Sequence, residues 1–200
     1  MNKPNLLFPT PVWTIQLENF SEINKELYDF IKDSQIKDNL GIKKSNNKGW
    51  HSNDFNMQEL IPQKFIKNIS PSIEKVITDM NWEKEKQSVK ISNMWAIINT
   101  GGSTNSRHQH GNSTISGAYY VRAPSNCGDI VFYDPRPAPV FYYPTAISSN
   151  LLNAQINSIT PKEGALILFP SYVDHSVNEN LSSDERIVIS FNVIIHPLKY

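Results

Sequence analysis

The beginning of the chain contains two segments with the apolar spacing of α-helices. A stripe of apolar residues runs along the first of them, the segment 21–34: Ile23, Leu27, Phe30 and Ile31. Because the stripe recurs at intervals of three and four residues, it lies on one face of a predicted helix. Ser21 or Asn19 could cap the start of this helix.

The second helical segment, 56–82, carries Pro62 and Pro71. Proline in the interior of a helix removes a hydrogen bond and breaks or kinks the helix. The segment therefore predicts two shorter helices rather than one. Between the two helical segments, residues 37–55 are polar and rich in turn formers, which predicts a loop.

After residue 90 the pattern changes to short β-type runs separated by Gly, Pro, Asn and Asp. The predicted strands cover 89–99, 106–111, 115–122, 129–134, 154–159, 164–170, 174–179 and 186–195. No helical spacing separates these runs, so the pattern indicates a β-sandwich or jelly roll rather than a parallel α/β sheet. The early helices would then pack on the outside of one sheet.

Two hundred residues is the size of one domain. We therefore expect a single domain over 1–200, mainly β with N-terminal helices. Residues 1–88 would supply an N-terminal strand and the helices, and 89–196 would form the β core. The segment 136–153 is proline-rich and aromatic, and a loop of this length often serves as a lid or binding loop.

The composition narrows the classes of partner. The chain has 19 basic and 19 acidic residues, so its zero net charge gives no electrostatic case for nucleic acid or an anionic membrane. No stretch approaches the roughly 20 apolar residues that span a bilayer. One cysteine, Cys127, cannot form an internal disulfide. We therefore expect a cytoplasmic protein, monomeric or homodimeric, with no nucleic-acid or membrane partner.

Candidate chemistry begins with His108 and His110, which are separated by one residue before a predicted strand. Alternate residues of a strand point to the same side, so both imidazoles could hold one metal ion. The alternative is an exposed pair in a polar loop. A further candidate, His175, follows the apolar strand that ends at Pro170. His51 and His196 carry less weight, because nothing around them in the sequence requires a metal site.

Arg186 opens the last, otherwise apolar strand. A buried guanidinium must be paired, and its fork of donors suits a carboxylate. Since alternate residues share one face, Ser190 and Asn192 would line the interior together with Arg186. The alternative is a solvated strand end beside Asp184 and Glu185.

The number and order of the motifs resemble the 2OG-Fe(II) oxygenases, specifically the bacterial and phage family related to prolyl hydroxylases. After the histidine pair come SGAYY (116–120), GDIVFYDPR (128–136) and PKEGALILFP (161–170), then His175 and Arg186. The stretches LLFPTPVW (6–13) and WAIINTGGSTNSRHQH (95–110) are also similar to that family. The resemblance covers nearly the whole chain, from about residue 7 to residue 195.

The resemblance implies a double-stranded β-helix, a cupin-like jelly roll, that binds Fe(II) and uses 2-oxoglutarate and O2. The implied reaction decarboxylates 2-oxoglutarate to succinate and hydroxylates an unactivated C–H bond of a prolyl-like peptide residue or a small molecule. Carried over to this chain, His108 and His175 are metal ligands and Arg186 binds the far carboxylate of 2-oxoglutarate. The rest of the cosubstrate pocket is assigned to Tyr120, Asn99 and Ser190, and Asn192 is added because it shares the inward face of the last strand with Arg186.

The chain departs from the wider superfamily at His110, where most members have a carboxylate that completes a triad with the two histidines. Three interpretations remain open. His110 is the third ligand, or it stays outside the ligand set and water takes the position, or a carboxylate such as Asp174 or Asp129 reaches in from elsewhere. We favour three histidines as the ligand set.

Two other functions are compatible with a histidine cluster in a jelly roll. One is a three-histidine, cupin-type metalloenzyme that uses no 2-oxoglutarate, either an iron dioxygenase or a zinc hydrolase. The other is a non-catalytic jelly-roll binding or structural protein, in which the histidines would not converge. Arg186 favours the oxygenase, because neither alternative needs a carboxylate clamp.

Overall fold

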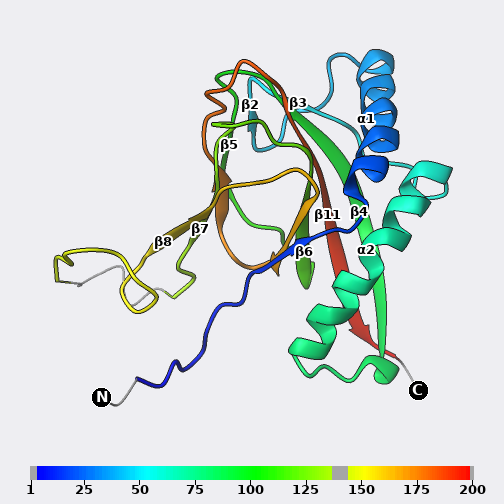
Figure 1. Ribbon diagram of the computed structural model, residues 1–200. Helices are drawn as coiled ribbons and strands as arrows, with labels where there is room; N and C mark the ends of the chain where they lie inside the picture. Colours follow the sequence, from blue (N-terminus) through cyan, green and yellow to red (C-terminus); the bar gives the residue numbers. More distant parts are fainter. Residues whose placement is uncertain (1–3, 137–143, 199–200) are drawn as a thin grey trace.

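The computed structural model describes residues 4–136 and 144–198, which form a mainly β structure with two long helices (Figure 1). The helices are α1 (Phe20–Lys37) and α2 (Leu60–Asp79), and a single 3-10 turn covers Lys84–Lys86. The strands are β1 (Trp13–Gln16), β2 (Asn46–Asn47), β3 (Trp50–His51), β4 (Gln87–Asn99), β5 (Thr104–His108), β6 (Ile115–Arg122), β7 (Ile130–Tyr133), β8 (Ile156–Ile159), β9 (Ala165–Pro170), β10 (His175–Val177) and β11 (Arg186–Pro197).

The strands form two antiparallel sheets. The larger sheet has the order β1-β9-β6-β11-β4-β3, and the smaller has the order β2-β5-β10-β7-β8. In Figure 1 both helices lie on the side of the larger sheet that faces away from the smaller one. This is the jelly roll, or double-stranded β-helix, that the sequence predicted.

The second helical segment differs from the prediction, because α2 is one continuous helix. Pro62 lies in its first turn, where backbone N–H groups have no partner within the helix. Pro71 lies inside the helix but on its exposed side. The carbonyl of Lys67, which loses an N–H partner there, belongs to an exposed residue and can be hydrated. The prediction of two short helices was therefore wrong, because packing of the apolar face outweighs the cost of one proline.

The core joins the helices to the larger sheet. Phe65 of α2 is fully buried, and its ring lies 5.0 Å from Tyr119 of β6 and 6.4 Å from Phe191 of β11. The hydroxyl of Tyr119 donates a hydrogen bond to Asn24 of α1. Residues from both halves of the chain thus share one apolar cluster.

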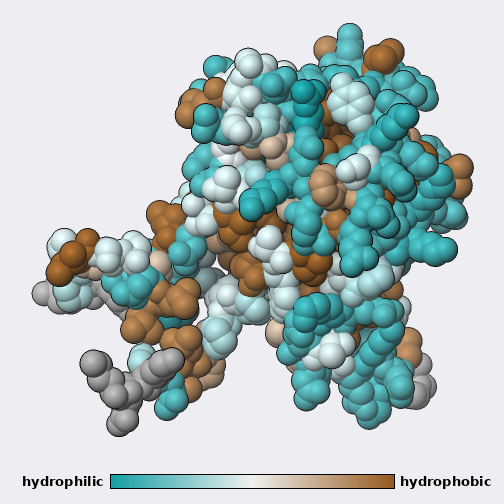
Figure 2. All heavy atoms as spheres, viewed as in Figure 1, coloured by the Kyte–Doolittle hydropathy of each residue, from teal (hydrophilic) through white to brown (hydrophobic). Residues whose placement is uncertain are grey.

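The loop predicted at 37–55 contains β2 and β3, which pair with β5 and β4 and so extend both sheets. Between β7 and β8, the described residues 144–155 form an arm that stands away from the barrel (Figure 1). Figure 2 shows apolar groups on this arm, and its exposed apolar residues are Ile147, Leu151 and Leu152. Within the described residues, no helix combines the length and the hydrophobicity needed to cross a bilayer.

Candidate metal centre and cosubstrate pocket

A cavity of about 690 Å³ receives side chains from both sheets. Its lining includes the three candidate metal ligands, Arg186 and the predicted cosubstrate residues Asn99, Tyr120, Ser190 and Asn192. The described part of the predicted binding loop, 144–153, contributes nothing to this lining, and residues 137–143 lie outside the described chain. The stretch from Ile42 to Asp54 does line it.

The three histidines converge although they come from distant parts of the sequence. His108 of β5 is the direct cross-strand partner of His175 of β10, and their ring centroids lie 4.3 Å apart. The ring of His110 lies 5.1 Å from each of them. One nitrogen from each ring falls within 4.8 Å of the other two, a spacing that fits a shared metal ion.

Backbone carbonyls orient two of the rings. The Nδ1 atom of His108 lies 2.7 Å from the carbonyl oxygen of Ser106, and Nδ1 of His175 lies 3.1 Å from that of Val173. Because a carbonyl only accepts, Nδ1 must carry the proton in both rings. The lone pair of Nε2 is thereby left for a metal, which is the usual arrangement of metal-binding imidazoles.

Burial keeps two of the three rings, those of His110 and His175, uncharged. Burial, the larger cause, and the adjacent histidines together lower the pKa of His175 to about 4 and that of His110 to about 3. Both rings are therefore neutral at pH 7, which is the form that binds metal.

A carboxylate does not complete the cluster among the described residues. Asp174 forms an ion pair of 2.6 Å with Arg107, and Asp129 accepts a hydrogen bond of 3.1 Å from Ser158. Both acidic candidates are thus engaged elsewhere. The geometry favours His110 over a carboxylate at the third position.

Arg186 is buried, with 2% of its surface exposed. Its Nη1 donates to the carbonyls of Cys127, Gly128 and Asn178. Its Nη2 has no hydrogen-bond partner, and no acidic side chain of the described chain forms an ion pair with it. Burial lowers the pKa of this guanidinium, because charge is costly in a dry environment. Such an unpaired group fits an anionic ligand.

The residues around Arg186 complete one end of the cavity. Asn99 is its cross-strand partner on β4, and the side-chain oxygen of Asn99 is buried without a partner. Tyr120 is buried on β6, and burial raises the pKa of its phenol, so the hydroxyl remains a donor. Ser190 and Asn192 lie further along the same inward face of β11.

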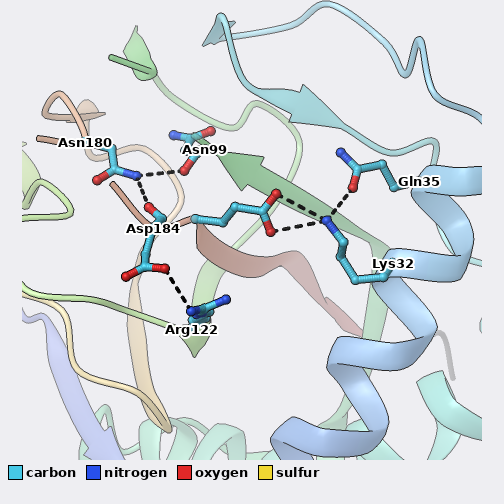
Figure 3. A network of polar contacts seen from close by, with 7 residues as sticks. Lys32, Gln35, Asn99, Arg122, Asn180 and Asp184 are labelled. Atoms are coloured by element: carbon cyan, nitrogen blue, oxygen red, sulfur yellow. Dashed lines mark hydrogen bonds and ion pairs between the residues drawn. The ribbon is translucent and has the colours of Figure 1, made fainter. Parts of the chain in front are cut away.

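The start of β11 is held by a residue that the sequence did not single out. Asn180 is fully buried, and its side-chain amide donates 2.8 Å hydrogen bonds to the carbonyls of Asn99 and Asp184 (Figure 3). Arg122 pairs with the carboxylate of Asp184 at 3.1 Å. These contacts fix the loop that leads into Arg186.

His51 was also undervalued by the sequence, because it lies in a stretch predicted as a loop. It is buried on β3, lines the cavity and stacks on Trp95 at 5.7 Å with an interplanar angle of 8°. The Trp95 ring in turn lies 5.8 Å from His110. The indole nitrogen of Trp95 is buried without a partner. Pairing of β3 with β4, which no short-range pattern encodes, brings these rings together.

The profile of a protein family described as "Putative 2OG-Fe(II) oxygenase" matches residues 93–192. The chain belongs to this family. The match spans the strands that carry all the histidines of the cluster and Arg186. The family's cofactors, Fe(II), 2-oxoglutarate and O2, fit the three imidazoles and the unpaired guanidinium. A search of curated proteins found no match.

Solved structures of 2OG oxygenases have the same fold. A prolyl-4-hydroxylase from Pseudomonas putida is 9% identical, with a TM-score of 0.66 over 92% of both chains. The viral collagen prolyl hydroxylase of Paramecium Bursaria Chlorella virus-1, in complex with 2OG, is 14% identical, with a TM-score of 0.59 over 91% of this chain and 94% of the other. HygX from Streptomyces hygroscopicus, with nickel, 2-oxoglutarate and hygromycin B bound, is 9% identical, with a TM-score of 0.63 over 92% and 82%.

Proposed function

We propose that this 2OG-Fe(II) oxygenase hydroxylates an unactivated C–H bond of a prolyl-like peptide residue or of a small molecule. The observation that supports the proposal is the buried Arg186, which has no acidic partner and lines the same cavity as three converging imidazoles. A metal site alone would also serve a hydrolase. The additional anion site is what a 2-oxoglutarate enzyme requires.

In this proposal His108, His110 and His175 bind the iron through neutral imidazole nitrogens. When bound, Fe(II) with 2-oxoglutarate and O2 supplies the oxidising chemistry, while the protein supplies position and electrostatics. The backbone carbonyls of Ser106 and Val173 keep the ring protons on Nδ1 and so aim Nε2 at the metal.

Arg186 binds the distal carboxylate of 2-oxoglutarate through its unpartnered Nη2. Tyr120 keeps its phenolic proton because burial raises its pKa, so it donates to the same carboxylate. Asn99 and Ser190 complete the polar lining of the pocket. Asn180 is a positioning residue, because it joins the end of β4 to the loop before β11.

Three neutral ligands change the charge balance of the site. A carboxylate in the ligand set would offset one positive charge of the metal, whereas His110 offsets none. The buried guanidinium of Arg186 adds a further positive charge to the same cavity. The dianionic cosubstrate therefore contributes most of the compensation, and metal and 2-oxoglutarate should strengthen each other's binding.

Aromatic side chains around the histidines limit the access of water. The rings of Phe169 and Phe132 lie 4.7 and 6.3 Å from His175. Trp95 covers His110 from the larger sheet. Exclusion of water strengthens the electrostatic interactions of the site and protects a reactive centre from side reactions.

Structural relatives support both substrate classes. The Trichoplax adhaerens prolyl hydroxylase was solved in complex with a peptide fragment, and HygX with hygromycin B. The cavity of this chain, at about 690 Å³, is larger than a small diacid requires and leaves room for part of a second molecule.

The proposal is tested by incubating purified protein with Fe(II), 2-oxoglutarate and O2 and measuring succinate. We expect succinate from the wild type, and none above background from His175→Ala or Arg186→Ala. Binding of 2-oxoglutarate to the Zn(II)-loaded protein, measured by calorimetry, provides a second readout that needs no turnover. Succinate formation that survives Arg186→Ala, or absence of 2-oxoglutarate binding by the metal-loaded wild type, would contradict the proposal.

A further inference from the structure

A chain of hydrogen bonds crosses three strands of the larger sheet at the end of the cavity away from Arg186. The hydroxyl oxygens of Ser171 and Ser116 lie 2.8 Å apart, and Ser116 donates to the side-chain oxygen of Asn192 at 2.8 Å. Asn192 donates from its amide nitrogen to the side-chain oxygen of Asn93 at 3.0 Å. The chain ends at Asn93, which lines the cavity.

The register of the strands gives the position of this hydrogen-bond chain. Asn192 is the cross-strand partner of both Asn93 and Ser116. Asn192 lies six positions after Arg186 along β11, a length of roughly 20 Å. A small diacid held by Arg186 does not extend that far. Asn192, which the sequence grouped with the cosubstrate residues because it shares the inward face of the strand with Arg186, therefore belongs to a different part of the cavity.

The metal centre lies next to this polar end. Trp95, two residues after Asn93 on the same face of β4, contacts His110 at 5.8 Å. Phe169, the cross-strand partner of Ser116, contacts His175 at 4.7 Å. Asn93 therefore lies on the cavity wall near the histidine cluster and away from Arg186, so a substrate that entered from this side would pass Asn93 on its way to a metal held by the histidines.

The hydrogen bonds determine what Asn93 offers to a ligand. Its side-chain oxygen accepts from Asn192 at 3.0 Å and from the hydroxyl of Ser92 at 3.0 Å, which uses both lone pairs. The amide nitrogen of the Asn93 side chain donates no hydrogen bond to any residue of the described chain. The side-chain N–H group of Asn93 is therefore a hydrogen-bond donor on the cavity wall, and the two hydrogen bonds to the side-chain oxygen fix its position.

The surroundings favour an uncharged acceptor for this donor. The four members of the chain carry no formal charge, so a carboxylate bound at Asn93 would lose its hydration with no cationic side chain among its direct hydrogen-bond partners. The free-energy cost of removing a carbonyl oxygen from water is far smaller, and one N–H donor is enough to satisfy it.

We propose that Asn93 is a specificity-determining residue whose amide N–H, oriented by Asn192 and Ser116, donates a hydrogen bond to an amide carbonyl of the substrate. The substrate is then a peptide or another secondary amide rather than an acid. This inference rests on the proposed function, since it requires iron between the cosubstrate and Asn93.

The experiment uses the full chain loaded with Zn(II) and 2-oxoglutarate and labelled with ¹⁵N-asparagine. The probes are N-methylacetamide, a neutral secondary amide, and propanoate, a carboxylate of similar size that contains no amide. We expect the neutral probe to shift the side-chain resonance of Asn93 saturably. Its affinity should exceed that of the acid about fivefold or more, which corresponds to roughly one hydrogen bond.

Two variants test the donor and its orientation. Asn93→Asp keeps a similar shape and both hydrogen bonds from Asn192 and Ser92 but removes the N–H donor. Ser116→Ala removes the donor that holds Asn192. Each variant should weaken binding of the neutral probe about fivefold and leave 2-oxoglutarate binding unchanged. The matched control is Asn157→Asp on the exposed surface, which should change neither the affinity for the probe nor that for 2-oxoglutarate.

The outcomes separate the two proposals. If 2-oxoglutarate binds but the neutral probe does not bind saturably, or binds Asn93→Asp as well as the wild type, the assignment of Asn93 is wrong and the oxygenase proposal stands. If the acid binds as tightly as the neutral probe, the assigned substrate class is wrong. If 2-oxoglutarate fails to bind the metal-loaded wild type, both proposals fall.

Discussion

His108 and His175 are direct cross-strand partners where β5 and β10 pair, although 67 positions separate them in the sequence. The pairing of two backbones therefore sets the distance between two candidate metal ligands, without help from the metal. His110 joins them from the turn that follows β5. The site is preorganised for an ion, and its ligands can be tested one at a time.

Substitution of the ligands should give a graded loss of metal affinity. His108→Ala and His175→Ala should abolish Fe(II) binding at micromolar concentrations. His110→Ala should weaken binding about 100-fold, and His110→Asp should restore most of it, because a carboxylate in this position completes the common triad. Calorimetric titration with Zn(II) or anaerobic Fe(II) measures these affinities. Wild-type affinity in His110→Ala would place His110 outside the ligand set.

The stability of the metal-free protein should fall in acid. The folded state lowers the pKa of His175 from 6.5 to about 4, so the unfolded chain binds a proton more readily between these values. Stability from this residue is complete above pH 6.5 and is lost as the pH falls towards 4, at up to about 1.4 kcal/mol per pH unit. Urea unfolding from pH 7.5 to 4.5 measures the slope, which should be shallower in His175→Asn. An identical slope in the variant would exclude this origin.

Arg186 should control 2-oxoglutarate affinity and not metal affinity. Arg186→Met retains the volume of the side chain but removes the charge that meets the carboxylate, so affinity should fall about 100-fold. For the wild type, 2-oxoglutarate at about 100 times its dissociation constant should stabilise the metal-loaded protein by about 2.7 kcal/mol. The variant should show almost no stabilisation at the same concentration. Arg186→Lys should be intermediate, because it keeps the charge without the fork.

Asn180 should act on 2-oxoglutarate through Arg186. Asn180→Ala removes the hydrogen bonds that hold the carbonyls of Asn99 and Asp184, so the guanidinium loses its fixed position. We expect about a tenfold loss of 2-oxoglutarate affinity with the Zn(II) affinity unchanged. A general structural defect would lower both affinities together. Asn157→Ala, on the exposed surface of β8, is the matched control.

We propose that the helices and the barrel form a single cooperative unit. Phe65 of α2 is fully buried against Tyr119 and Phe191 of the barrel. Phe65→Ala should therefore destabilise the whole chain by about 3–5 kcal/mol. Urea unfolding followed by fluorescence and by circular dichroism should give coincident single transitions. Two separate transitions would instead indicate that residues 1–88 form an independent unit.

Much of the fold was readable in the sequence because each strand has a local signature. Seven of the eight predicted strands agree with the structure to within two residues at both ends, and the run 115–122 agrees at both boundaries; the run 106–111 ends three residues too late. Tyr119 and Tyr120 point to opposite faces, as alternation requires. Pro71 misled the prediction, because a local rule about proline cannot anticipate the apolar surface that α2 buries.

The site was readable where its residues are chemically conspicuous. His108, His110, His175 and Arg186 stand out as rare or costly residues beside apolar strands. His51 and Asn180 could not be found in this way. Their roles come from tertiary contacts, the stacking of His51 on Trp95 and the hydrogen bonds of Asn180 across the loop, and no sequence pattern encodes those contacts.

The two halves of the site rest on sheets of unequal size. The guanidinium of Arg186 lies on a 12-residue strand paired with a 13-residue one, whereas the candidate metal ligands lie on and beside strands of five and three residues. Short strands open locally at a smaller cost than long central ones. Amide protons of β5 and β10 should therefore exchange with deuterium sooner than those of β11, and iron should retard them. A metal bound by the three histidines would then be lost through fraying of the smaller sheet, while Arg186 remains in place.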